Sequence, residues 1–437
     1  MTTPDTRTIL SRTAAAIILS IGAAWLGASV SSAQSAAKNE AATSVAGRWI
    51  GTADLNGRQV PFRLDISGSG DQLRAALVNG KERSPASSGS YAGGHLVLHF
   101  DYYANTLDAT VEDGVLSGTF GGHSHDVPLV ARRNAKTPPA SADPPNIAGE
   151  WEVAVEGPKG EHAWKLNVRQ AGAEVEAVIE RIDGDTGALY GEWRDHQFAI
   201  SHFTAAGPSY ADLEPRADGT LELVTAGHGG SVQRLTARRP REARSQGLSG
   251  PDDPMQHTSL KNPHKPLSFQ FPDLSGKLVS SGDPAFKGKA LIVSVGGSWC
   301  PNCQDEAPFL EELYQRFHSH GLEIVELSFE EESQLSSLAR LKAVIKRFGI
   351  TYTVLVPGTP DQLAEKFPGV ANLNCWPTTF FIGRDGLVKA IHAGFSGPAA
   401  DKDNRELRNE TTSLVERLLS GGERTAEVSG ALPLPAH

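Results

Sequence analysis

Cysteine is scarce in this sequence, with only three among 437 residues. Two of them, Cys300 and Cys303, form one Cys-x-x-Cys motif, and the third is Cys375. A disulfide that closes so short a loop removes little entropy from the unfolded chain, so a fold-stapling role explains the pair poorly. A zinc site is also disfavoured, because no second Cys-x-x-Cys or Cys/His cluster supplies the four ligands it would need. Redox chemistry is the better explanation.

A basic excess and long internal apolar runs are absent as well. The formal net charge is -10, which argues against a general nucleic-acid binder because phosphates require a basic surface. After the N-terminal region, no segment is long and apolar enough to cross a bilayer. The remaining composition, 39% hydrophobic and 21% charged, is typical of a soluble globular protein, and the length predicts two or three domains.

Residues 1–33 predict an export signal. Arg7 and Arg12 precede an apolar run at 14–26, and Ser31-Ser32-Ala33 forms a small-residue cleavage site. The apolar run is shorter than the ~20 residues of a spanning helix, which favours cleavage over an uncleaved membrane anchor. No cysteine follows it, which excludes a lipobox-type anchor. We expect an exported protein of the periplasm or cell envelope, anchored to a membrane only if this segment stays uncleaved.

Two segments, 45–133 and 146–239, look like copies of one module. Each contains short alternating apolar runs separated by Gly, Asp and Asn, the pattern of antiparallel strands. We therefore expect two small all-β barrels or sandwiches, joined by a proline-rich linker at 134–145. The opening and closing motifs of the two copies are Gly47-Arg48-Trp49 with Ala131-Arg132-Arg133, and Gly149-Glu150-Trp151 with Ala237-Arg238-Arg239.

After a second predicted linker at 240–265, residues 266–422 alternate between strand and helix patterns, which predicts an α/β domain. A disordered tail is expected at 423–437. The predicted strands of the α/β domain are 291–295, 322–329, 351–356 and a hairpin of 378–382 with 387–393. The predicted helices are 303–320, a second that runs from Leu335 to Phe348 and ends at Gly349, and 404–419.

The motif Trp299-Cys300-Pro301-Asn302-Cys303 lies where the first predicted strand gives way to the first helix. A sulfur at a helix N-terminus is near free amides and the positive end of the dipole, which favour the thiolate. Cys300 is therefore the expected nucleophile. Cys303, one helical turn later, can resolve the resulting mixed disulfide by forming the intramolecular bond.

These features resemble the thioredoxin superfamily, and specifically the TlpA/ResA-like extracytoplasmic thiol-disulfide oxidoreductases of the redoxin group. The resemblance covers residues 266–422. It implies exchange with thiols and disulfides of exported proteins, an unidentified thiol electron donor, and no cofactor. The matching residues are Phe271-Pro272-Asp273-Leu274, Gly276-Lys277, Gly288-Lys289, Ser298 to Cys303, Glu306, Pro308, and Trp376-Pro377-Thr378-Thr379-Phe380-Phe381-Ile382.

The resemblance assigns roles to three residues beyond the cysteines. Pro377 is expected to follow a cis peptide bond beside the disulfide, where neighbouring backbone would hold a substrate chain extended. Glu306 is a candidate proton acceptor for Cys303, with a carboxylate that interacts with the helix dipole as the alternative. Pro308 matches a structural proline of the helix.

The sequence also departs from the family pattern. Thioredoxins proper carry a buried Asp where this chain has Ser294, so proton transfer would need Glu306, water or another group. The dipeptide Pro301-Asn302 between the cysteines is unusual and leaves the redox potential open. Trp376 is bulky for its loop. Cys375 should lie near the motif, either as an accessory exchange partner or as a buried bystander.

Two other functions deserve comparison with thiol-disulfide exchange. A thiol peroxidase is possible within the redoxin group, but peroxiredoxins carry a Thr three residues before the reactive Cys, where this chain has Gly297. Alternatively, the β-modules could be the functional part of a binding protein with an accessory redox domain. Their candidate features are the ligand-type stretch His123-Ser124-His125-Asp126 with His228, more simply explained as solvated polar residues, and the aromatic residues Tyr91, Tyr102, Tyr103 and Trp193, more often core.

Overall fold

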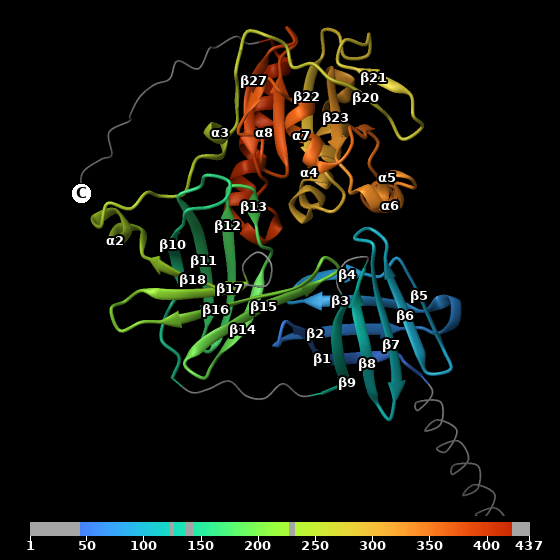
Figure 1. The fold of residues 1–437 in the computed structure, drawn as a ribbon, viewed down its shortest axis with the longest axis vertical. Helices are drawn as coiled ribbons and strands as arrows, with labels where there is room; N and C mark the ends of the chain where they lie inside the picture. Colours follow the sequence, from blue (N-terminus) through green and yellow to red (C-terminus); the bar gives the residue numbers. More distant parts are fainter. Residues whose placement is uncertain (1–43, 123–125, 136–142, 227–231, 422–437) are drawn as a thin grey trace, which may run out of the picture.

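The computed structural model describes residues 44–122, 126–135, 143–226 and 232–421. Two antiparallel β-modules and one α/β domain follow one another along the chain (Figure 1). The predicted signal at 1–33, the tail at 423–437, and the residues His123, His125 and His228 lie outside these ranges. In the described part of the chain, no helix has the length and apolar character to span a membrane.

Module 1 is one antiparallel sheet that curves into a half-barrel, with strand order β4-β3-β2-β1-β9-β8-β7-β6-β5. Alternate side chains of its strands point inward and are fully buried, including Trp49, Leu64 and Phe120. The strands are β1 (Gly47–Leu55), β2 (Arg58–Ser67), β3 (Arg74–Asn79), β4 (Glu82–Pro85), β5 (Ser88–Ala92), β6 (His95–Phe100), β7 (Asn105–Glu112), β8 (Val115–Gly121) and β9 (Asp126–Arg133).

Module 2 is a closed barrel of eight antiparallel strands, because β11 pairs with β12 and completes the ring. A ninth strand, β13, has only two residues and extends the edge of β12. The strands are β10 (Gly149–Ala154), β11 (Ala163–Ala171), β12 (Glu174–Arg181), β13 (Gly184–Asp185), β14 (Leu189–Arg194), β15 (Gln197–Thr204), β16 (Gly207–Pro215), β17 (Leu221–Ala226) and β18 (Val232–Arg238).

The opening and closing motifs meet in the same way in both modules. The guanidinium of Arg133 lies 5.1 Å from the ring centre of Trp49, and that of Arg239 lies 3.7 Å from that of Trp151. Each indole also donates to the carbonyl four residues earlier, of Val45 and of Ile147 respectively, at 2.9 Å. These cation-π pairs join the first strand of module 1 to its last strand, and the first strand of module 2 to the residue directly after its last strand.

The α/β domain is built on a five-stranded mixed sheet with the order β24-β23-β22-β26-β27. Every residue of the central strand β22 is buried, as expected for an apolar run covered on both faces. Its three parallel strands are β22 (Ala290–Gly296), β23 (Leu322–Ser328) and β24 (Thr353–Leu355), and its antiparallel pair is β26 (Thr378–Ile382) with β27 (Val388–Ala393). The predicted strands and hairpin are confirmed, with small shifts at their ends.

The first and last predicted helices are confirmed as α4 (Pro301–Phe317), followed by a 3-10 turn (His318–His320), and α8 (Lys402–Leu419). The prediction of one helix from Leu335 to Phe348 is wrong: the chain forms α5 (Glu332–Leu335) and α6 (Ala339–Phe348), with Leu338 in the left-handed region at φ 52°. Smaller elements were not predicted: η1 (Gly70–Gln72), β20 (Gln270–Pro272), β21 (Leu278–Ser280), η4 (Pro360–Gln362), α7 (Leu363–Lys366), β25 (Val370–Ala371) and η5 (Pro398–Ala400).

The segment 240–265 contains short elements that contact both of its neighbours. They are α2 (Pro240–Ser245), α3 (Pro254–His257) and β19 (Ser259–Leu260), and β19 pairs with β25 of the α/β domain. His257 Nε2 lies 2.7 Å from Asn374 Oδ1, and Asp252 accepts hydrogen bonds from His162 of module 2. This segment therefore connects module 2 to the loop that precedes Pro377.

Candidate functional site

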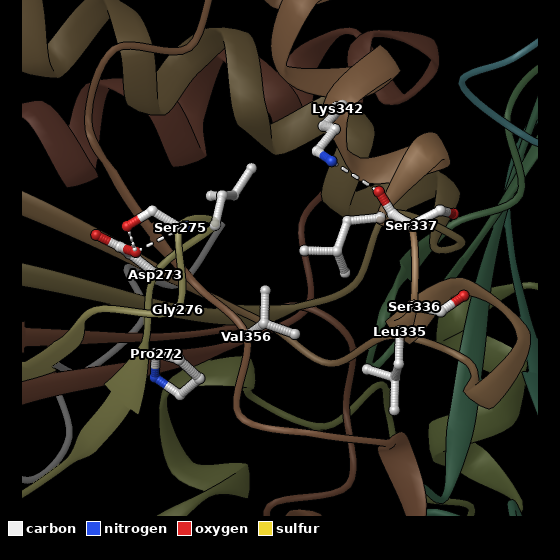
Figure 2. Close-up of a pocket in the computed structure, with 11 residues that line it drawn as sticks. Pro272, Asp273, Ser275, Gly276, Leu335, Ser336, Ser337, Lys342 and Val356 are labelled. Atoms are coloured by element: carbon white, nitrogen blue, oxygen red, sulfur yellow. Dashed lines mark hydrogen bonds between the residues drawn. The ribbon is translucent and has the colours of Figure 1, made fainter.

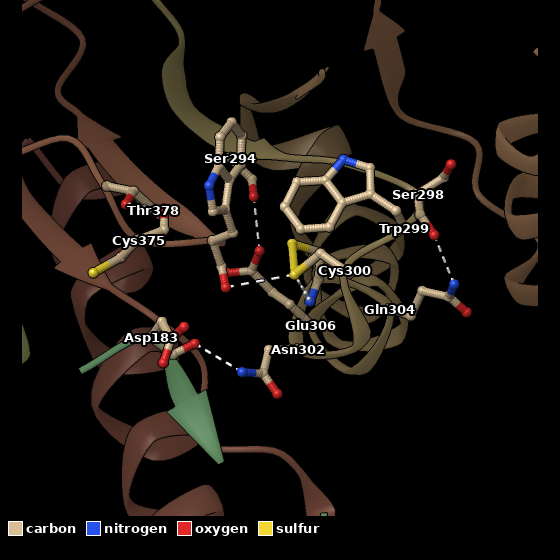
Figure 3. The surroundings of a disulfide bond; sticks show 12 residues. Asp183, Ser294, Ser298, Trp299, Cys300, Asn302, Gln304, Glu306, Cys375 and Thr378 are labelled. Carbon is tan, nitrogen blue, oxygen red and sulfur yellow. Dashed lines mark hydrogen bonds between the residues drawn. A yellow bond between two sulfur atoms is a disulfide. The ribbon is translucent and has the colours of Figure 1, made fainter. Parts of the chain in front are cut away.

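Cys300 and Cys303 form a disulfide at the N-terminus of α4, with their Cα atoms 5.3 Å apart (Figure 3). Cys300 is the N-cap residue, and its Sγ accepts a hydrogen bond of 3.2 Å from the Cys303 amide. An N-cap sulfur takes one of the free donors of the first helical turn, which is the environment that stabilises a thiolate. The geometry predicted for the nucleophile is therefore present, and Cys300 is only 3% exposed.

The loop before β26 approaches this sulfur. The Trp376–Pro377 peptide bond is cis, as the family resemblance implies, and the Trp376 carbonyl oxygen lies 3.5 Å from Cys300 Sγ. The Trp376 ring makes edge-to-face contacts with Trp299 and Phe329, at centroid distances of 5.4 and 5.7 Å. These contacts give the unusually bulky Trp376 a place in an aromatic cluster beside the disulfide.

Glu306 lies in the interior, one turn of α4 after Cys303. Its two carboxyl oxygens accept hydrogen bonds of 2.7 Å from the hydroxyls of Ser294 and Thr379. Burial raises its pKa to about 7, although both hydrogen bonds favour the ionised form. Ser294, the residue found in place of the thioredoxin Asp, thus holds a carboxyl group contributed by the helix.

Glu306 and Cys303 cover the same face of β22. Ser294 and Gly296 are two residues apart, so their side-chain directions coincide. A Cβ added at Gly296 would lie 3.2 Å from Cys303 Sγ, while the Ser294 hydroxyl donates to Glu306.

Glu326 of β23, which pairs with Ser294, is a second buried carboxyl group, and burial raises its pKa to about 7. Sequence reasoning missed Glu326, because its position in an apolar strand carries no motif.

The turn before Cys300 is held by a buried ion pair that the sequence did not reveal. Glu330 accepts hydrogen bonds from the Ser298 amide at 2.9 Å and from its hydroxyl at 2.6 Å. Arg340 of α6 pairs with Glu330 at 3.1 Å and donates to the Ser298 hydroxyl at 2.8 Å. Both charged side chains are at least 95% buried, with Glu330 0% and Arg340 5% exposed. The pair therefore fixes the backbone that carries the nucleophile.

Cys375 lies near the motif, as expected, and it is fully buried between Ile182 and Ala393. Desolvation raises the pKa of its thiol to about 12. Both features agree with the buried-bystander interpretation, since a thiol in apolar surroundings is a poor nucleophile.

Both β-modules contact the helix that starts at the disulfide. Asn302 Nδ2 donates to the Asp183 carbonyl of module 2 at 2.9 Å (Figure 3), and Gln304 Nε2 donates to the Tyr102 carbonyl of module 1 at 2.7 Å. Tyr102 is buried, and Tyr91 and Tyr103 also pack against the core, while Trp193 packs on Phe198. The interpretation as a core residue is confirmed for Tyr102, whereas Tyr91, Tyr103 and Trp193 are only partly buried against the core. No sequence signal predicted the contacts of Asn302 and Gln304.

A cavity of about 430 Å³ lies apart from the disulfide, between the turn at 272–276 and the break between α5 and α6 (Figure 2). Lys342 and Val356 complete its lining, which includes no residue of the Cys-x-x-Cys motif. Among the described residues, no group of three or more His, Cys, Asp or Glu side chains is arranged to hold a metal.

Part of the chain, including the disulfide, is similar in sequence to known proteins. Residues 264–391 match the model of the AhpC/TSA family. The chain is 31% identical over 126 residues to the thiol-disulfide oxidoreductase ResA of Geobacillus thermodenitrificans, covering 29% of this chain and 66% of that protein. It is 28% identical over 127 residues to ResA of Bacillus subtilis, covering 29% and 64%.

The match leaves part of each relative uncovered: the chain spans 63% of the length of ResA from Bacillus anthracis. A solved thiol:disulfide interchange protein of Chlorobium tepidum is 26% identical, with a TM-score of 0.28 over 36% of this chain and 97% of that one. The family assignment rests on the sequence matches. Residues 264–391 are a redoxin domain of the AhpC/TSA type, distantly similar to ResA, with Cys300 and Cys303 as its Cys-x-x-Cys pair.

Proposed function

We propose that this chain is an extracytoplasmic thiol-disulfide oxidoreductase that exchanges its Cys300–Cys303 pair with exported proteins. The observation that carries the proposal is the position of Cys300 Sγ at the α4 N-terminus, capped by the Cys303 amide and adjacent to the cis-Pro377 loop. The similarity to ResA supports the reaction type, and the signal predicted at 1–33 supports the compartment.

In the reducing direction, the Cys300 thiolate attacks one sulfur of a substrate disulfide. A mixed disulfide forms, and the other substrate sulfur leaves as a thiolate that takes a proton from water. Cys303 then loses its proton, with the Glu306 carboxylate as acceptor, and attacks Cys300 Sγ. This step forms the intramolecular disulfide and releases the second substrate sulfur as a thiolate, which takes a proton from water. Two electrons pass from the cysteine pair to the substrate, and an external thiol donor restores the dithiol.

The peroxidase alternative lacks its threonine for a steric reason. A Cβ added at Gly297 would lie 2.5 Å from the Phe329 carbonyl oxygen and would collide with the Trp299 indole, so this position has no room for a side chain. A peroxide-consumption assay run beside the exchange assay would detect such an activity directly.

Cysteine variants test the exchange mechanism. Insulin reduction with dithiothreitol should be lost in Cys300→Ser, because the attacking sulfur is absent. Cys303→Ser that has been reduced and then freed of dithiothreitol should instead accumulate a mixed disulfide with insulin, visible on a non-reducing gel, because no thiol is left to resolve it. Cys375→Ser is the matched control and should retain activity, since this thiol is buried. Full turnover in Cys300→Ser would refute the assigned nucleophile.

A further inference from the structure

The surface beside Cys300 carries a segment of module 2, residues 182–185, which forms the turn after β12 and the two-residue strand β13. The Asp183 carbonyl accepts the hydrogen bond from Asn302, two residues after the nucleophile. Gly184 forms a parallel bridge with Phe395, in the loop that follows β27. Ile182 covers Cys375, the neighbour of the Trp376 whose carbonyl contacts Cys300 Sγ. The segment thus touches both structures that flank the reactive sulfur.

The backbones in this contact lie too close together for any further polypeptide to pass between them. A Cβ added at Gly394 would lie 2.5 Å from the Asp183 carbonyl carbon and from the Ile182 oxygen. Asp185 accepts a hydrogen bond of 2.5 Å from the Gly397 amide, which holds the end of the segment. Segment 182–185 is therefore seated along loop 394–397, with Asn302 on one side and Cys375 on the other.

The backbone beside Pro377 is expected to hold a substrate chain next to the disulfide, and Ile182 packs on Cys375, two residues before Pro377. Cys300 is 3% exposed and Cys375 is 0% exposed while the segment is seated. A small thiol needs far less room at the sulfur than a folded or extended chain does. The seated segment thus competes with a protein substrate for the place beside the nucleophile.

We propose that segment 182–185 is a gate: it occupies the protein-binding surface beside Cys300 and must lift away before a protein substrate can exchange with the disulfide. This inference rests on the proposed function and adds its regulation. Within module 2 the segment is held by only two ladder pairs, Glu180–Asp185 and Arg181–Gly184, so lifting it breaks little of the barrel. It is held on the α/β domain by the contacts with Asn302, Phe395 and Gly397.

The substitution Gly184→Val should displace the gate by steric clash. A Cβ at this position would collide with the Phe395 carbonyl oxygen and lie 2.5 Å from Asn302 Nδ2. Gly207→Val is the matched control in the same module, because Gly207 has nearly the same φ as Gly184, 115° against 118°, but nothing within 4 Å of an added Cβ. Both variants carry similar backbone strain, and only Gly184→Val disturbs the contact with the α/β domain.

The first readout is alkylation of Cys375 by iodoacetamide in the oxidised protein, where it is the single free thiol of the chain. Gly184→Val should accelerate labelling roughly 10-fold or more, since reactivity follows the open fraction, while Gly207→Val should match the wild type. If Gly184→Val fails to fold, Ile182→Ala removes the cover over Cys375 without backbone strain and should also accelerate labelling. Wild-type labelling rates in the folded variant would overturn the gate.

The second readout compares a large with a small exchange partner. Gly184→Val should raise the rate of insulin reduction several-fold and leave the rate at which dithiothreitol reduces the Cys300–Cys303 bond unchanged. Equal rates with insulin for Gly184→Val and wild type would refute the gate while leaving the proposed function intact. Failure of every variant and of the wild type to exchange with insulin would refute the proposed function instead.

Discussion

Glu306 is a carboxyl group that titrates in the pH range where thiol exchange has to operate. Its burial raises its pKa to about 7, so it is a proton acceptor above that pH and a neutral acid below it. The exchange rate of the wild type should therefore rise as pH increases through about 7. Glu306→Gln should remove this inflection and lower the rate at pH 8 by roughly 10²-fold, the usual effect of losing a general base.

A pH-rate profile of insulin reduction checks this prediction. Glu312→Gln is the matched control, because Glu312 is on the same helix but its side chain is 58% exposed. An unchanged profile in Glu306→Gln would favour the alternative, in which the carboxylate only interacts with the helix dipole. The raised pKa also means that ionised Glu306 opposes folding: its contribution to stability is present below its ordinary pKa and is lost as pH rises through about 7.

Individual residues could be predicted from sequence where a local pattern specifies them. Cys300, Cys303 and Pro377 lie in short motifs, and a strand followed by a helix was enough to place the sulfur at a helix N-terminus. Glu330 and Asp183 could not be predicted, because each acts on the motif from a distant part of the chain. A lone carboxylate or a backbone carbonyl has no spacing pattern that marks such a contact.

At the scale of elements, α6 and the loop that follows β23 support the active-site turn through one buried ion pair, between Arg340 and Glu330. Removing one partner of such a pair leaves the other charge buried without compensation, at a cost of about 3–5 kcal/mol. Arg340→Ala should therefore destabilise the α/β domain by this amount and loosen the turn at Ser298. Urea unfolding measures the loss of stability. Hydrogen exchange of the β22 and α6 amides in the folded protein measures the loosening.

Arg405→Ala is the control for that experiment. Arg405 pairs with Asp401 on the surface, where both side chains are more than half exposed, and such pairs contribute about 0–1 kcal/mol. Equal losses in the two variants would contradict the special role of Arg340.

The break between α5 and α6 shows where element prediction from periodicity fails. Leucines at 335, 338 and 341 follow a helical spacing, yet Leu338 adopts φ 52° and ends the continuity. Two contacts stabilise the break: the Leu338 amide donates to the Gln334 carbonyl at 2.7 Å, and the Arg340 amide donates to the Gln334 side chain at 3.2 Å. The interruption allows Arg340 to face Glu330, a tertiary requirement that apolar spacing does not encode.

At the scale of the whole molecule, each of the three domains contributes an acidic group to one region: Glu82, Asp185 and Asp305. Burial raises the pKa of all three, with Asp185 at about 6, and the negative neighbours Asp185 and Glu82 raise that of Asp305 further. Tyr103 also faces this region, and Arg347 partly offsets the charge of Glu82. The contact between the three domains is therefore most stable when these acids are protonated.

The stability of this arrangement should fall as pH rises. An acid with a raised pKa contributes stability that is fully present below its ordinary pKa and lost as pH increases through the folded-state value, about 6 for Asp185. The melting temperature of the full chain should thus decrease between about pH 5 and pH 8. The decrease should be smaller in Asp185→Asn/Asp305→Asn, whereas Asp108→Asn, an exposed control, should behave as the wild type.

The fold classes of all three domains could be predicted, because alternation and helical spacing are local signals repeated along each segment. How the domains meet could not. The contacts of Asn302, Gln304 and Gly184 join residues more than 100 positions apart in the sequence, and each uses a backbone group that any amino acid would supply. The proposed regulation therefore became visible only in three dimensions.

Module 2 closes through the pairing of β11 with β12, so its cylinder is complete without β13. Amino-acid changes in that two-residue strand and its turn leave the main ladder and the barrel interior untouched. Evolution could therefore retune how tightly the redox centre is shielded, or which proteins reach it, by rewriting a few positions while the supporting scaffold stays the same.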